Sequence, residues 1–84
     1  MSKYSHVVDD RLRTILDQGS QDPADLDYAI QETAEAVSGD EDDEDVSYET
    51  FNQRQDALET AEAAWHDDSD AAATVAALQR CWSV

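Results

Sequence analysis

The chain has 84 residues, of which 21 are acidic and 5 are basic, so its formal net charge at pH 7 is −16. This charge excludes binding to nucleic acid through a basic patch and attachment to an anionic membrane surface, because both need clustered Lys and Arg. The length allows one modest hydrophobic core, and a single cysteine excludes an internal disulfide.

The first predicted helix covers residues 4–18. Its apolar residues recur at steps of three and four, which is the pattern of an amphipathic helix. Gly19 follows it as a helix-terminating glycine, and Asp22 before Pro23 is typical of an N-cap followed by proline at the first helical position. The second predicted helix therefore covers residues 23–38 and ends before the second glycine of the chain.

An acidic loop is predicted over residues 40–46. Six successive carboxylates, Asp40 to Asp45, cannot form a stable helix interior, because like charges four residues apart repel each other. Apolar residues then recur at a spacing close to 3.5 again, which predicts a third helix over residues 47–66.

The last predicted helix covers residues 69–82. Asp67, Asp68 and Asp70 interrupt the preceding pattern, and the helix dipole favours acids at a helix N-terminus. The third and fourth helices could instead form one long kinked helix. Because no strand-like alternation and no internal repeat occur, we predict a single all-α domain over residues 1–84, a compact bundle of three to four helices.

The negative charge is distributed unevenly along the chain. Residues 1–21 sum to zero and residues 71–84 to +1, whereas residues 22–70 hold 18 acids against Arg54 alone, a net charge of −17. An excess of Asp over Glu and a single Lys are typical of halophilic proteins. Adaptation to high salt, however, gives no reason for the negative charge to be confined to residues 22–70. We therefore expect a functional acidic surface directed at a basic partner.

The candidate contact residues are acids whose spacing imitates a phosphate track. Helical residues three or four apart lie roughly 5–6 Å from each other at Cβ, and phosphates rise about 3.4 Å along each nucleic-acid strand. Tyr28 lies among these acids, either exposed as a partner for arginine or partly buried against the first helix. The candidate acids are Asp40, Glu41, Asp42, Asp43, Glu44, Asp45, Asp56, Glu59 and Glu62, with Asp25, Asp27, Glu32 and Glu35 as second choice.

No metal site, cofactor or catalytic centre is predicted. A calcium-binding EF-hand loop that starts at Asp40 would need Gly at its sixth position and Glu at its twelfth, where this chain has Asp45 and Phe51. No motif for a nucleophile, a catalytic zinc or a bound phosphate occurs, so we expect no enzyme. The soft metal ligands lie on three separate segments without the spacing of a zinc site: His6, His66 and Cys81.

In size, helical make-up and acidity over residues 22–70, the chain resembles the small DNA-mimic inhibitors of phages and mobile elements, which include anti-CRISPR and anti-restriction proteins. The resemblance implies a non-catalytic inhibitor that occupies the basic DNA- or RNA-binding groove of a partner. We expect the chain to be a monomer or a homodimer. A CRISPR effector complex is the first expected target, because its DNA channel is lined by Lys and Arg. The alternative is a halophile-type small acidic helical adaptor that binds a protein through apolar surface.

The sequence also gives an expectation for the compartment. No apolar run follows the first residues and no window approaches the length of a membrane span, so we expect a cytoplasmic protein without a signal peptide. For a phage-encoded inhibitor this would be the cytoplasm of the host cell.

Overall fold

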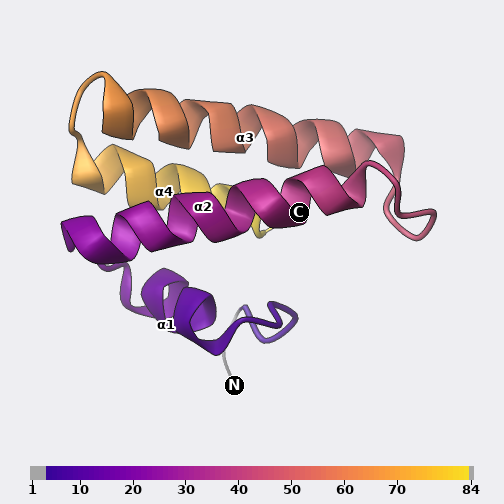
Figure 1. The fold of residues 1–84 in the computed structure, drawn as a ribbon, viewed down its shortest axis with the longest axis horizontal. Helices are drawn as coiled ribbons and strands as arrows, with labels where there is room; N and C mark the ends of the chain where they lie inside the picture. Colours follow the sequence, from indigo (N-terminus) through magenta and orange to yellow (C-terminus); the bar gives the residue numbers. More distant parts are fainter. Residues whose placement is uncertain (1–3, 84) are drawn as a thin grey trace.

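The computed structural model describes residues 4–83, which form four helices joined by short connections (Figure 1). The helices are α1 (Asp10–Gln18), α2 (Pro23–Asp40), α3 (Tyr48–His66) and α4 (Ala71–Cys81). α3 and α4 form an antiparallel pair, α2 packs against both of them, and α1 contacts α2 and α4. No strand occurs between residues 4 and 83, so the predicted all-α bundle is confirmed.

The first helix is shorter than the predicted helix of residues 4–18. It begins only after Asp9, whose carboxylate caps the N-terminus by accepting a backbone hydrogen bond of 2.8 Å from the first turn. Before the cap the chain forms a turn, closed by a 2.9 Å hydrogen bond from the Val7 N–H to the Tyr4 carbonyl. Tyr4 and Val7 are buried all the same, whereas Val8, which follows them, is 95 % exposed. The apolar residues Tyr4 and Val7, whose spacing resembles that of a helix, therefore belong to a turn that packs on the core.

The second helix is longer than predicted, because it continues through Gly39 and ends at Asp40. The Asp40 carboxylate accepts a hydrogen bond of 2.7 Å from Arg54 on α3, and this ion pair ties the last turn of α2 to its neighbour. The acidic connection accordingly runs over residues 41–47 and not over 40–46.

The other helix ends follow local sequence signals. Gly19 ends α1 in the left-handed conformation and Asp22 caps α2, as predicted. Ser47 caps α3 and so lies just outside it. α3 and α4 are separate helices, and Asp70 caps α4, which covers fewer residues than the predicted 69–82. Asp67 instead follows the C-terminus of α3, where its N–H bonds to a carbonyl of the last turn.

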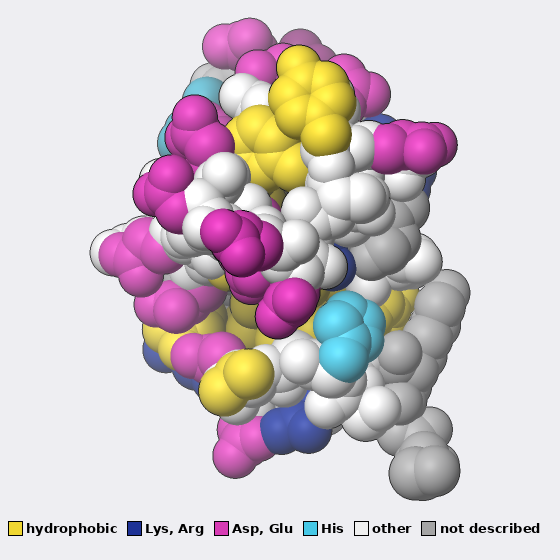
Figure 2. Space-filling model, turned by 90° about the vertical axis from the view of Figure 1, so that its right-hand side faces the viewer, with side chains coloured by type: hydrophobic (Ala, Val, Ile, Leu, Met, Phe, Trp, Pro, Cys, Tyr) yellow, Lys and Arg dark blue, Asp and Glu magenta, His cyan; other side chains and the backbone are white. Residues whose placement is uncertain are grey.

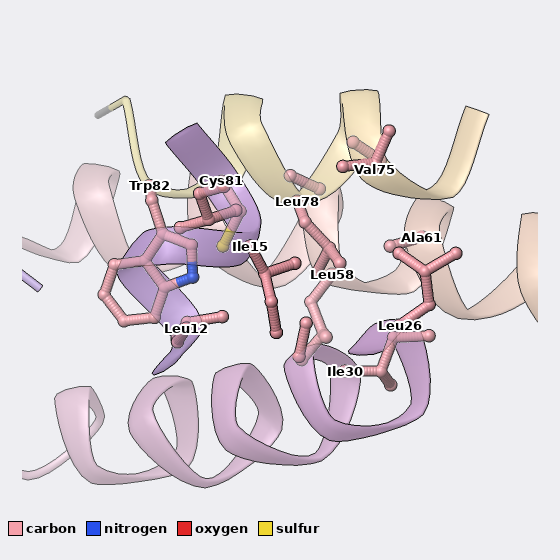
Figure 3. Packing of buried hydrophobic residues seen from close by; sticks show 14 of the residues in the cluster. Leu12, Ile15, Leu26, Ile30, Leu58, Ala61, Val75, Leu78, Cys81 and Trp82 are labelled. Carbon is pink, nitrogen blue, oxygen red and sulfur yellow. The ribbon is translucent and has the colours of Figure 1, made fainter. Parts of the chain in front are cut away.

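The core lies where the four helices meet, and side chains from each of them point into it (Figure 3). Small alanines on α2, α3 and α4 are buried between the larger residues, which allows the helices to pack closely. Trp82 covers the core after the end of α4, and its indole N–H donates a 3.0 Å hydrogen bond to the buried hydroxyl of Thr33. The central large residues are Leu12, Ile15, Leu26, Ile30, Leu58 and Leu78.

The two glycines predict opposite effects of substitution by alanine. Gly19 has φ +61°, which disfavours any side chain, so Gly19→Ala is expected to lower the free energy of unfolding by about 1–2 kcal/mol. Gly39 has helical backbone and open space around an added Cβ, so Gly39→Ala is expected to raise it by roughly 0.5–1 kcal/mol. Chemical unfolding followed by circular dichroism measures both. Destabilisation by Gly39→Ala would contradict the continuation of α2 through this residue.

Candidate acidic interface

The connection between α2 and α3 forms an acidic projection at one end of the bundle (Figure 1). A turn hydrogen bond of 3.1 Å runs from the Val46 N–H to the Asp43 carbonyl, and the Asp43 carboxylate accepts one of 2.9 Å from the Asp45 N–H. These bonds hold the acids of the connection together as one local group. We call this group the acidic tip; its members are all exposed and are Glu41, Asp42, Asp43, Glu44 and Asp45.

α3 carries a second set of acids on the side that faces away from the core. Asp56 and Glu59 are exposed and three residues apart, which makes them neighbours on the helix surface. Glu49 is also exposed and lies seven residues before Asp56, about two helical turns away on the same side. We call Glu49, Asp56 and Glu59 the acidic ridge. Glu62, the remaining candidate on this helix, is half-buried at its flank.

Glu49 was not among the predicted contact residues. Its seven-residue distance from Asp56 is the signal that could have identified it, because a heptad spacing returns to nearly the same side of a helix. The position in the first turn of α3 also favours an acid, since the helix dipole stabilises negative charge there.

Asp40 differs from the other acids of the run, because its carboxylate is used inside the protein. Asp40 and Arg54 form an ion pair of 2.7 Å between side chains that are 16 % and 13 % exposed. The Arg54 guanidinium also lies over the indole of Trp82, 5.5 Å from the ring centroid. Asp40 therefore serves to hold α2 against α3.

Two of the second-choice acids on α2 also have partners within the fold. Asp25 pairs with Arg11 at 3.5 Å and accepts a 2.8 Å hydrogen bond from the hydroxyl of Ser20. Asp27 accepts a 2.7 Å hydrogen bond from the indole N–H of Trp65 on α3. These carboxylates contribute to packing between helices more than to a free acidic surface.

The other two second-choice acids, Glu32 and Glu35, line a groove of about 720 Å³ between α2 and the segment that leads into α1. α1 contacts α2 and α4 but not α3, so this groove lies on a different side of the bundle from the acidic ridge. The structure therefore divides the predicted contact residues between two surfaces. The groove is lined by His6, Val7, Val8, Asp9, Leu12, Glu32, Glu35, Ala36, Asp40 and Trp82.

Tyr28 is half-buried against α1, and its ring contacts an arginine of that helix. The Arg11 guanidinium lies 4.1 Å from the centroid of its ring, and its hydroxyl donates a short hydrogen bond to the Asp9 carboxylate. The second of the two predicted environments, partial burial against the first helix, is thus the one observed. This hydrogen bond raises the pKa of Tyr28 to about 12 and lowers the pKa of Asp9, with desolvation of the phenol as a further cause of the Tyr28 shift.

The Tyr28 hydrogen bond predicts a specific alkaline titration. Because the folded-state pKa is raised, the contribution of the neutral phenol to stability is complete below about pH 10 and is lost as the pH rises toward 12. The difference in phenolate absorbance between the native chain and Tyr28→Phe should have its midpoint at about 12. In an Asp9→Asn background we expect this midpoint to move toward about 10; the same midpoint in both backgrounds would rule out Asp9 as the cause.

Asp9 has the opposite dependence at acidic pH. Its pKa is lowered in the folded protein, so its contribution to stability is present above the unfolded-state value of about 3.9 and is lost as the pH falls through the lower folded-state value. The acid unfolding of Asp9→Asn should therefore depend less steeply on pH than that of the native chain.

The ion pairs described between residues 4 and 83 lie away from the acidic tip and the acidic ridge. The ion pairs described for residues 4–83 place Arg11 on Asp25, Arg54 on Asp40, and Arg13 on an acid of its own helix. None of these pairs involves the tip or the ridge. Figure 2 views the right-hand side of Figure 1, and Asp and Glu side chains gather there around an exposed hydrophobic patch.

Cys81 is a free cysteine that is buried on α4. Burial raises the pKa of its thiol to about 11, so the reactive thiolate is suppressed at neutral pH. Within residues 4–83, no three His, Cys, Asp or Glu side chains are arranged to hold a metal ion.

The helices described here include none that is long and apolar enough to cross a membrane. Comparisons of the chain with protein-family models, with curated proteins and with solved structures found no match.

Proposed function

We propose that this protein is a non-catalytic inhibitor that occupies the basic nucleic-acid-binding groove of a partner, with a CRISPR effector as the first candidate target. The observation that carries the proposal is the set of exposed carboxylates formed by the acidic tip and the acidic ridge, from which the described arginine ion pairs are absent. Such a surface attracts a channel lined by Lys and Arg and accelerates the encounter.

The fold supports the proposal because it holds this charge on a helical frame. A helix rises 1.5 Å per residue, so the backbone positions of Glu49 and Asp56 are about 10 Å apart along the axis of α3. Those of Asp56 and Glu59 are about 4.5 Å apart along the same axis. The tip adds five neighbouring carboxylates at the N-terminal end of the same helix. A partner would meet charges that are already arranged, which lowers the entropy cost of binding.

The alternative function, an acidic adaptor that binds through apolar surface, has its own supporting observation. The groove between α2 and the segment before α1 exposes apolar side chains, and Val8 at its edge is 95 % exposed. A partner bound there would be held by apolar burial, which salt does not screen.

Capture of partners at different salt concentrations separates the two functions. The immobilised protein is exposed to a lysate of bacteria that carry CRISPR systems, and bound proteins are eluted with rising salt and identified by mass spectrometry. The inhibitor function predicts nucleic-acid-binding proteins that elute at moderate salt and are displaced by added DNA. Partners that remain bound in molar salt and are not displaced by added DNA would favour the adaptor function.

A further inference from the structure

A hollow of about 260 Å³ lies at the start of α3, beside the acidic tip. Tyr48, the first residue of α3, is 80 % exposed and is one of only two exposed large hydrophobic residues in the described chain. Val46 and Phe51 are half-exposed beside it, and Asp40 and Glu41 complete the lining. We call this feature the Tyr48 hollow.

At two other places in the described part of the chain, an arginine contacts both an aromatic ring and a carboxylate. Arg11 lies 4.1 Å from the centroid of the Tyr28 ring and 3.5 Å from the Asp25 carboxylate. Likewise, the Arg54 guanidinium lies 5.5 Å from the centroid of the Trp82 ring and 2.7 Å from the Asp40 carboxylate. A guanidinium suits such a place because its plane stacks on the ring while its N–H groups reach the carboxylate.

We infer that the Tyr48 hollow binds an arginine side chain of the partner protein. The guanidinium stacks on the exposed ring of Tyr48, its methylene stem contacts Val46 and Phe51, and Glu41 supplies the counter-charge. Asp40 is already paired with Arg54, which leaves Glu41 as the other acid of the lining. The inference rests on the proposed function and adds to it that the partner surface carries arginine, for which lysine is a poor substitute.

Arginine preference can be measured with two peptides of equal charge. Fluorescein-labelled hexa-arginine and hexa-lysine are titrated with the full chain at low salt, and binding is followed by fluorescence anisotropy. We expect Tyr48→Ala to weaken hexa-arginine binding by about 2- to 5-fold and to leave hexa-lysine binding unchanged. Tyr48→Phe keeps the ring and should keep the preference. Val8→Ala, which truncates the other exposed large hydrophobic residue of the described chain, should leave both affinities unchanged.

Equal weakening of the two peptides by Tyr48→Ala, or no weakening of either, would overturn the inference. The proposed function fails in a different way, namely if charge reversal in the acidic tip leaves binding to the effector unchanged. Circular dichroism of each variant establishes that the helices are retained. Because Tyr48 is mostly exposed, its truncation leaves the core intact.

Discussion

Leu78→Ala is expected to lower the free energy of unfolding by about 2–5 kcal/mol. Leu78 is fully buried on α4, where it points toward Leu58 of α3 and Ile15 of α1 (Figure 3). Truncation removes apolar contacts and leaves a cavity that the surrounding helices can only partly fill. A domain of this length has a total stability of about 4–13 kcal/mol, so the variant loses a large share of it.

Denaturant unfolding followed by circular dichroism measures this loss, with Val8→Ala as the matched control. Val8 is 95 % exposed, and its truncation should change the free energy of unfolding by less than about 0.5 kcal/mol. An equally small effect of Leu78→Ala would contradict the packing of α4 onto the other helices.

Reversal of three acids in the tip is expected to lower affinity for the target effector by about 100-fold or more at low salt. The variant carries Asp42→Lys, Asp43→Lys and Glu44→Lys, which places like charges opposite the basic groove at a cost of several kcal/mol. All three side chains are exposed and lie outside the helices, so the helical circular dichroism should be retained. Isothermal titration calorimetry with the purified effector measures the change.

A control reversal tests whether position or total charge matters. Asp67 and Asp68 are exposed in the connection between α3 and α4, at the opposite end of α3 from the acidic tip. Asp67→Lys with Asp68→Lys should weaken binding only modestly, through the long-range field that salt screens. If this pair weakens binding per charge as much as the tip variant does, only net charge matters and the acidic tip is not the contact surface.

Local signals predicted most of the fold. Gly19, Asp22 and Asp70 lie at helix ends because a left-handed turn or a capped N–H depends on residues only a few positions away. The extent of the first helix was wrong for a physical reason: Tyr4 and Val7 reach the core from a turn as well as they would from a helix, and periodicity does not separate the two. The prediction that the second helix ends before Gly39 was also wrong, because tertiary contacts override the weak tendency of glycine to interrupt a helix.

The candidate interface was less predictable, because it depends on which carboxylates the fold uses internally. Asp40 is bound to Arg54, fourteen residues away, and Asp27 to Trp65, thirty-eight residues away. The amino-acid sequence does not distinguish these internally bonded acids from the exposed acids of the acidic tip. The exposure of Tyr48 was also not predicted, since an aromatic residue at the start of a helix can equally turn toward the core.

The most direct test of the proposed function is competition between this protein and DNA for one effector. A guide-loaded CRISPR effector is saturated with labelled target duplex at low salt, and fluorescence anisotropy is followed as the protein is added. An inhibitor that occupies the nucleic-acid groove releases the duplex stoichiometrically, and the acidic-tip reversal variant does not. A ternary complex in which the effector holds both DNA and this protein would contradict the proposal.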